Sequence, residues 1–261
     1  MSAADTSGPG TVEPGTIEPG VLCGVGTGPG DPELMTFRAA RRIAEAPVVA
    51  YFCKRGTTGQ ARRIADAHIG PGQIEEALEY PVTNEIAHEE ESYRSRIEAF
   101  FDQCAERLAA HLEAGRSVCV LNEGDPYFYG SFMHVHLRLR ERFRSEVVPG
   151  VISPIAAAAQ LPAPLVMRDD TLSVVPGTLP ETELEAALAP AQAAVIMKLG
   201  KQLPKIRRVL ERLGLTARAW YIERASFDEE RVRPLAEALE ETSGEAPYFS
   251  LIVIHGEGVR R

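Results

Sequence analysis

The sequence predicts an α/β protein made of two α/β units. Apolar segments with the character of strands alternate along the chain with helical segments of about 10–15 residues, which is the pattern of strands joined by helices. Pro162 and Pro164 interrupt this alternation and separate a first unit, residues 21–155, from a second, residues 156–261. The 261 residues are enough to bury a core in each unit.

The elements of the first unit follow from its apolar pattern. Its strongest helix signal is an apolar stripe at steps of three and four residues, ended by Gly115. The stripe consists of Ile97, Phe101, Cys104, Leu108 and Leu112. We expect strands at 21–25, 47–52, 117–121 and 146–148, a short extended segment at 78–82, and helices at 34–44, 57–68, 87–113 and 131–143.

The second unit repeats the alternation with shorter elements. We expect strands at 171–175, 193–198, 217–222 and 248–254, and helices at 181–189, 201–213 and 234–241. Residues 1–20 stand apart, because they are rich in Gly, Pro, Ser and Thr and bury too little apolar area to offset their ordering entropy. We interpret them as a disordered N-terminal tail.

Composition and charge exclude some classes of function. With 37 acidic and 28 basic residues, the formal net charge of -9 argues against non-specific binding to nucleic acid or to an anionic membrane. No apolar run approaches the roughly 18 residues of a membrane span, and no signal segment is visible, so we expect a cytoplasmic protein. The cysteines are too widely spaced for a zinc site, and we expect buried thiols and no protein-bound metal. They are Cys23, Cys53, Cys104 and Cys119.

A glycine-rich loop, Gly-Val-Gly-Thr-Gly-Pro-Gly-Asp-Pro at 24–32, lies between the first strand and the first helix. Glycines there let the backbone approach a ligand closely. The loop lacks the Gly-Lys-Ser/Thr ending of a phosphate-binding loop. The second strand ends in Tyr-Phe-Cys-Lys at 51–54, without the acid that holds a ribose in Rossmann folds. A tight turn without a ligand is the alternative.

Four further motifs follow predicted strands. They are Asn-Glu-Gly-Asp-Pro-Tyr-Phe-Tyr-Gly at 122–130, Val-Val-Pro-Gly-Val-Ile-Ser at 147–153, Val-Ile-Met-Lys-Leu-Gly at 195–200, and Tyr-Ile-Glu-Arg-Ala-Ser at 221–226. Each also has an ordinary interpretation: a type I turn, an N-cap at Ser153, or a core position for Met197. The strand-end acceptors at 122–130 would suit the amino group and the ribose of a sulfonium cofactor.

The order of these five motifs resembles the tetrapyrrole methylase family, from about residue 21 to residue 256. The resemblance implies two unlike α/β domains with the cofactor, S-adenosylmethionine, in the cleft between them, and a homodimer. Within the family, the segments 51–54, 80–83 and 122–133 are most similar to the methyltransferases that act at C20 of precorrin-2 in vitamin B12 biosynthesis.

The resemblance also implies the cofactor contacts, most of them through the backbone. Ile152 stands where a threonine is frequent in the family, which removes one hydroxyl contact. The implied contacts are Pro29, Glu123, Gly124, Asp125, Phe128, Ile152, Ser153, Met197 and Ala225.

The implied reaction is in-line methyl transfer that leaves S-adenosylhomocysteine, and a base must then remove the proton from C20. Glu123, Asp125 and Tyr129 are the catalytic candidates, with His134 beside them. Cofactor binding and packing are their alternative roles. The acid that often follows the second strand in other members is replaced here by Phe52 and Cys53.

The small-molecule substrate carries many carboxylates, so an acidic protein must place bases near it. Arg38, Lys54, Arg55, Arg168, Lys198 and Lys201 lie beside the motifs. Alternatives to this function are a cobalt-loaded substrate, a sister acceptor such as another ring carbon or diphthine, a non-catalytic binder, and an NAD-dependent oxidoreductase.

Overall fold

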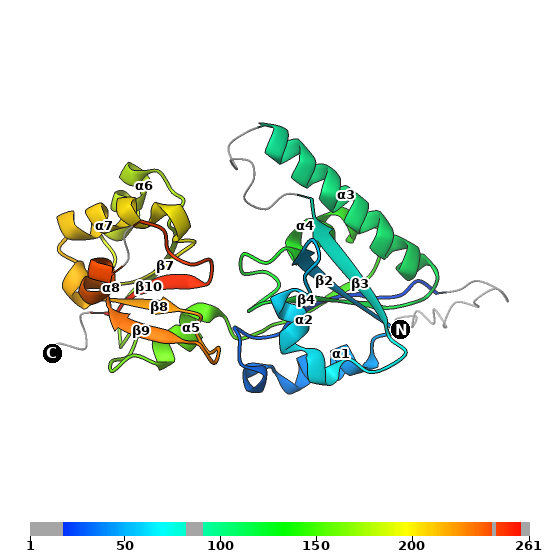
Figure 1. Ribbon diagram of the computed structural model, residues 1–261. Coiled ribbons are helices and arrows are strands. Elements are labelled where there is room, and N and C mark those ends of the chain that lie inside the picture. The colour runs from blue at the N-terminus through cyan, green and yellow to red at the C-terminus, as the bar shows by residue number, and fades with distance from the viewer. Residues whose placement is uncertain (1–17, 82–90, 242–243, 257–261) are drawn as a thin grey trace, which may run out of the picture.

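Two separate five-stranded sheets form the centre of two domains in the computed structural model, which describes residues 18–81, 91–241 and 244–256 (Figure 1). The first sheet has the order β3-β2-β4-β1-β5, and all its neighbouring strands are parallel. Its strands are β1 (Leu22–Gly26), β2 (Val48–Lys54), β3 (Ile74–Tyr80), β4 (Val118–Asn122) and β5 (Ser145–Val148).

The second sheet is mixed and has the order β6-β7-β10-β8-β9. Among its described strands, only β6 and β7 pair in parallel, whereas β10 runs antiparallel to both β7 and β8. Its strands are β6 (Leu172–Pro176), β7 (Ala193–Met197), β8 (Ala219–Glu223), β9 (Arg231–Pro234) and β10 (Ser250–Ile254). The predicted fold of two unlike α/β domains is therefore confirmed.

Helices cover both faces of the first sheet. Alternate strand residues point to opposite faces, so Leu22 packs with α3 and α4 while its neighbour Cys23 packs with α1 and α2. The helices are α1 (Phe37–Glu45), α2 (Gln60–Ile64), α3 (Glu91–Glu113) and α4 (Phe132–Leu139), with 3₁₀ turns at Pro32–Leu34 and Asp66–His68. The predicted burial of the four cysteines as free thiols is confirmed.

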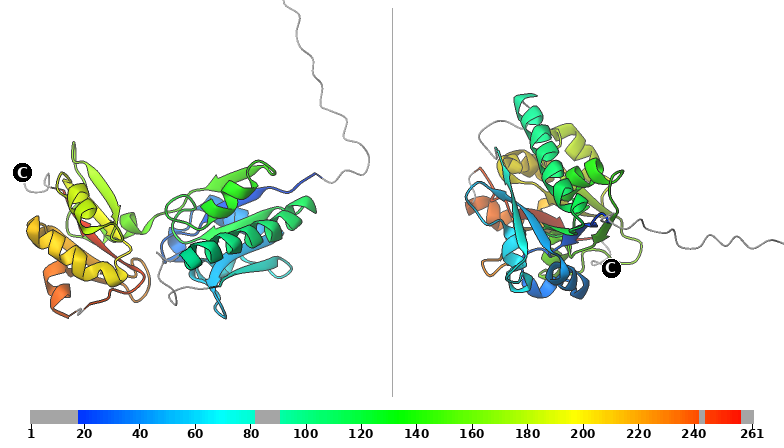
Figure 2. Two further views of the ribbon diagram at one scale, coloured as in Figure 1. Left: turned by 90° about the horizontal axis from the view of Figure 1, so that it is seen from above. Right: turned by 90° about the vertical axis from the view of Figure 1, so that its right-hand side faces the viewer.

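The second domain has α6, α7 and α8 on one face of its sheet and α5 on the other. Helix α5 (Ser153–Ala159) follows the first sheet directly and buries Ala156 and Ala157 against the second, so it connects the domains (Figure 2). The predicted boundary between residues 155 and 156 falls inside this helix and stays a prediction. The other helices are α6 (Glu181–Leu188), α7 (Leu203–Arg212) and α8 (Leu235–Glu241), with 3₁₀ turns at Gly200–Gln202 and Thr216–Arg218.

Several predicted boundaries shift for local reasons. Helix α1 begins at Phe37, not at 34, because the Thr36 side chain accepts a hydrogen bond from the Ala39 N–H and caps the helix there. Strand β3 begins at Ile74, not at residue 78. Glu75, Glu76 and Glu79 interrupt the apolar pattern by which this edge strand would be recognised. Strand β9 was not predicted, since its Arg-Val-Arg-Pro sequence carries two charges. Residues 1–17 of the predicted tail, residue 82 and residues 87–90 lie outside the described residues.

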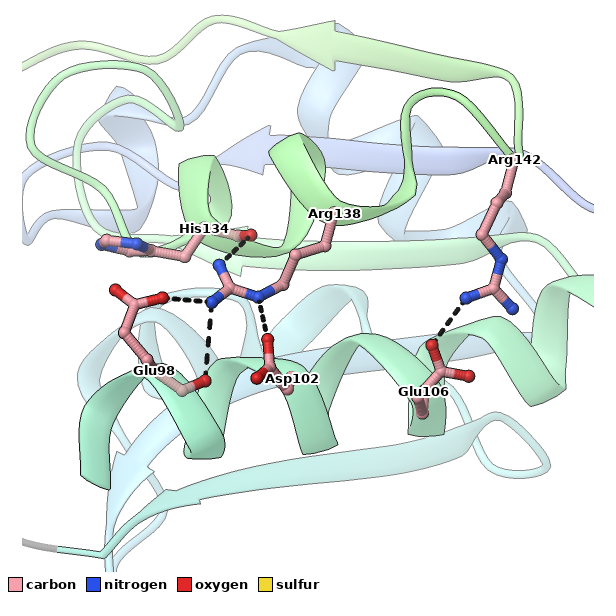
Figure 3. Close-up of polar contacts among 6 residues, drawn as sticks. All are labelled: Glu98, Asp102, Glu106, His134, Arg138 and Arg142. Atoms are coloured by element: carbon pink, nitrogen blue, oxygen red, sulfur yellow. Dashed lines mark hydrogen bonds and ion pairs between the residues drawn. The ribbon is translucent and has the colours of Figure 1, made fainter. Parts of the chain in front are cut away.

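Two arginines of α4 and of the turn after it hold the exposed sides of α3 and α4 together (Figure 3). The Arg138 guanidinium donates to Asp102 Oδ1 at 2.7 Å and also pairs with Glu98. The Arg142 guanidinium lies 2.6 Å from Glu106 Oε1. Within the described ranges, no helix is long and apolar enough to cross a membrane.

Replacing Arg138 with methionine is expected to lower the free energy of unfolding by about 1 kcal/mol, since the change removes two partly exposed ion pairs and a cation–π contact with Phe101. Urea denaturation at low and high salt measures the loss, which should shrink at high salt. The control is Arg140→Met, because Arg140 pairs with its exposed neighbour Glu141. Equal stability of the Arg138 variant and the wild type at low salt would contradict the prediction.

Candidate active site

Three of the five sequence motifs follow three adjacent strands. In the order β4-β1-β5 all strands are parallel, so their carboxyl ends meet at one edge of the sheet. The loops are joined directly: the Gly124 N–H donates to Gly28 O at 2.8 Å, and the Thr27 N–H donates to Asn122 O at 2.9 Å. Ligands of open α/β sheets bind beyond this edge. The structure therefore gathers the glycine loop and the motifs at 122–130 and 147–153 into one place.

Glycines at this edge permit a backbone crossing that no other residue would allow. A Cβ atom on Gly150 would lie 2.1 Å from Gly124 O and 2.9 Å from Gly26 Cα. A Cβ atom on Gly26 would lie 2.5 Å from Gly124 O. Gly124 has a φ of 67°, yet nothing lies closer than 3.7 Å to the position of its own Cβ. The glycines thus pack the three loops together, and the position of a Cβ on Gly124 lies in van der Waals contact with Ile152.

Asp125 fastens the loop after β4 to the start of the segment after β5. Its Oδ1 accepts from the Tyr127 N–H at 2.8 Å, and its Oδ2 accepts from the Gly150 N–H at 3.1 Å. Because both carboxylate oxygens bind backbone groups, the side chain serves to hold the loops in register. This arrangement favours a positioning role for Asp125 over proton transfer.

Glu123 is the most chemically distinctive residue of the site. Its Oε1 accepts a hydrogen bond from the Ala61 N–H at the start of α2, at 3.0 Å. The residue is exposed to solvent, yet desolvation by surrounding protein is the largest cause that raises its pKa above the usual value for glutamate. The carboxylate is therefore accessible to a ligand although protein surrounds it. A raised pKa makes this carboxylate a better proton acceptor.

The aromatic residues after Glu123 differ in their surroundings. Tyr129 has a φ of 58° and is 42% exposed, and its ring lies edge-on to Phe128. His134 stacks on Phe101 with ring centroids 4.0 Å apart, and burial lowers its pKa. The His134 ring therefore has a packing role, whereas Tyr129 stands at the site with its ring accessible.

The second domain presents its two motifs at a common edge. Since β10 lies between β7 and β8 and runs antiparallel to both, these two strands point the same way. Met197 at the end of β7 and Ala225 just after β8 therefore lie at the same edge of the sheet, on either side of β10. The Asp31 N–H of the glycine loop donates to Ser226 Oγ at 3.1 Å. This bond ties the loop after β8 to the loop after β1, so the contact residues predicted in the two domains face a shared region.

The segment after β5 departs from the N-cap interpretation of Ser153. Ile152 occupies the cap position of α5, and Ser153 is the first residue of the helix, without a capping side-chain hydrogen bond. The Ser153 hydroxyl is half-buried and makes no hydrogen bond with the described residues, so it is available to a ligand.

Three polar residues that sequence reasoning did not single out help to build the site. The buried Thr27 Oγ1 donates to Asn122 O at 3.1 Å, and Asn122 Oδ1 accepts from the Phe132 N–H at 3.1 Å. Ser226 carries the contact between the domains described above. All three lie within the motifs, but only the tertiary structure shows what their side chains bind.

A cavity of about 400 Å³ lies beside this region, between the glycine loop, α5 and the loop after β8. Its lining includes Asp31, Val151 and Ser226, which lie within two residues of the predicted contacts Pro29, Ile152 and Ala225. None of the predicted contact residues lines the cavity itself, so it is not part of the predicted cofactor site.

The residues present suit S-adenosylmethionine. The acidic motif at 122–125 suits the cofactor's amino group and ribose, and the Ser153 hydroxyl is available. The small buried Ala225 leaves room for a flat base. The individual contacts stay predictions.

Known proteins are similar to this chain in sequence and in fold. A profile of the family described as Tetrapyrrole (Corrin/Porphyrin) Methylases matches residues 21–239, and the chain belongs to this family. It is 48% identical over 235 residues to a precorrin-2 C(20)-methyltransferase from a Sinorhizobium species, covering 90% of this chain and 95% of that protein. It is 29% identical to the cobalt-precorrin-2 C(20)-methyltransferase of Salmonella typhimurium, again covering 90% and 95%.

Among solved structures, uroporphyrin-III C-methyl transferase from Thermus thermophilus, complexed with S-adenyl homocysteine, is similar with a TM-score of 0.63. The two chains are 29% identical, with 92% of this chain and 99% of that chain covered.

Proposed function

We propose that this protein transfers a methyl group from S-adenosylmethionine to C20 of precorrin-2 in cobalamin biosynthesis. The observation that carries the proposal is the 48% identity to a precorrin-2 C(20)-methyltransferase across nearly the whole of both chains. The identity to the cobalt-precorrin-2 enzyme is lower, at 29%, which favours the metal-free substrate. The gathered strand ends and the desolvated Glu123 support a transferase site.

In this proposal, one set of residues binds the cofactor and another acts on the substrate. When bound, S-adenosylmethionine supplies an electrophilic methyl group on a sulfonium, with S-adenosylhomocysteine as the leaving group. The backbone around Pro29, Gly124 and Ile152 would align the cofactor, together with the side chains of Phe128, Ser153 and Met197. Ala225 would pack against its base.

Glu123 would accept the proton that C20 loses after the new carbon–carbon bond forms. Its raised pKa and its exposure favour it over Asp125, whose oxygens both bind backbone N–H groups. Tyr129 remains a candidate for orienting the substrate. No protein-bound metal enters the proposal.

We extend the proposal to the setting of the enzyme. We propose that it acts in the cytoplasm, as a homodimer, on a small-molecule tetrapyrrole, without nucleic-acid or membrane partners. Sedimentation equilibrium of the full chain tests the dimer, and a single species of monomer mass at micromolar concentration would contradict it.

Anaerobic incubation of the full chain with S-adenosylmethionine and precorrin-2, with and without cobalt in the ring, tests the reaction. Mass spectrometry should show one added methyl per tetrapyrrole, and NMR should place it at C20, with faster transfer to the metal-free ring. Faster transfer to the cobalt form would reassign the substrate. No methylation of either ring would refute the C20 assignment.

A further inference from the structure

Lys198 of the second domain contacts Tyr129 of the first domain, in the loop that follows β4. The Lys198 ammonium lies 4.7 Å from the centroid of the Tyr129 ring. Lys198 directly follows Met197, and Tyr129 directly follows Phe128, so each partner is next to a predicted cofactor contact of its own domain. The contact therefore spans the region where the two sets of strand ends face each other.

Both residues adopt a backbone conformation that side chains other than glycine rarely take. Tyr129 has a φ of 58° and Lys198 a φ of 57°. Among the described residues, four of the five non-glycine positions with positive φ follow β4, β7 or β8. Such conformations cost free energy and cluster at functional sites. Here they aim the Tyr129 and Lys198 side chains toward each other.

The backbone at Lys198 is fixed in place. The Gly177 N–H donates to Met197 O at 2.6 Å, and a Cβ atom on Gly177 would lie 3.2 Å from Lys198 O. The glycine at 177 thus lets the segment after β7 lie close to it. The direction of the Lys198 side chain thus follows from the packing of its own domain.

The ammonium is exposed and lacks an anionic partner. Neighbouring arginines of this domain are paired, Arg224 with Glu229 and Arg233 with Glu223 and Glu241. Within the described part of the chain, Lys198 lies within ion-pair distance of no carboxylate, and the tyrosine ring is its partner. An exposed cation–π contact of this kind contributes little, so a carboxylate can readily compete for the ammonium.

We propose that Lys198 binds a carboxylate of the tetrapyrrole substrate, and that the Tyr129 ring holds its ammonium in position until the substrate arrives. The inference rests on the proposed methyl transfer to an anionic tetrapyrrole, and it assigns Lys198 to substrate recognition, separate from the cofactor contacts. Lys198 thereby supplies local positive charge to the site of a protein whose formal net charge is -9.

The test compares Lys198→Met, Lys198→Arg and the control Arg207→Met in the full chain. Arg207 lies on α7 of the same domain and pairs with Glu211, so its replacement removes one positive charge from the surface. Steady-state formation of S-adenosylhomocysteine with precorrin-2 gives KM and kcat, and calorimetry gives the Kd of S-adenosylhomocysteine.

Lys198→Met should raise the KM for precorrin-2 by roughly tenfold, as expected for the loss of one charged hydrogen bond, with the Kd of the cofactor product unchanged. Lys198→Arg should restore most of the KM, and Arg207→Met should match the wild type. An unchanged KM in Lys198→Met would overturn the inference alone, as would an equal rise in the Kd of the cofactor product. A wild type that methylates no tetrapyrrole would overturn the proposed function and this inference with it.

Discussion

Glu123→Gln is expected to reduce kcat for methyl transfer by about 100-fold or more, the usual contribution of a positioned general base. Glutamine keeps the size of the side chain, and its carbonyl oxygen can still accept from the Ala61 N–H. It cannot take up the C20 proton. Calorimetry should therefore show S-adenosylhomocysteine binding close to that of the wild type while turnover is lost.

The same substitution should leave the protein equally or more stable at neutral pH. Protein around Glu123 raises its pKa, so as pH rises the unfolded chain loses this proton first and is favoured. The destabilisation grows from the unfolded pKa of about 4.3 up through the raised folded pKa, and it is complete above that value. Glu123→Gln removes this destabilisation, so its melting temperature should exceed that of the wild type most clearly above that range.

A matched control for both measurements is Glu141→Gln, because Glu141 is exposed in the turn after α4 and pairs only with its neighbour Arg140 among the described residues. This variant should turn over normally. Wild-type kcat in Glu123→Gln would refute the assignment of the base and direct attention to Tyr129. A large fall in melting temperature would show that Glu123 stabilises the fold through its ionised form.

Gly150→Ala is expected to disrupt both stability and cofactor binding. The new Cβ would lie 2.1 Å from Gly124 O and 2.9 Å from Gly26 Cα, and both of these are backbone atoms that cannot turn aside as a side chain can. Relief of this clash requires the loop after β4 to move away from the end of β5. The movement would break the Gly150 N–H bond to Asp125 and displace Gly124 from Gly28.

Overpacking of this kind costs about 1–3 kcal/mol or more, and we expect at least a tenfold loss of S-adenosylhomocysteine affinity in the variant that folds. Urea denaturation and calorimetry measure the two effects. Gly70→Ala is the control, since a Cβ there would meet only the flexible end of Gln73 at 3.8 Å. Wild-type stability and affinity in Gly150→Ala would show that the three loops are not packed as described.

The alternation of strands and helices was readable from the sequence because each element buries an apolar face of characteristic period. The apolar stripe from Ile97 to Leu112 predicted the helix that the structure places at α3. Edge elements were harder, because an edge strand has one partner and tolerates charge. This explains the late predicted start of β3, with its three glutamates, and the unpredicted β9.

For the site, too, the sequence determined one part and the tertiary structure another. The sequence by itself determined the motifs, their order and the family, since glycines such as Gly150 and acids such as Glu123 and Asp125 stand at fixed places after strands. It left Glu123, Asp125 and Tyr129 as equal catalytic candidates. Only the tertiary structure shows how their surroundings differ, because hydrogen-bond partners and desolvation depend on residues far apart in the chain, such as Ala61 for Glu123 and Gly150 for Asp125. The meeting of Lys198 with Tyr129 was likewise decided by the packing of two domains, which no local pattern encodes.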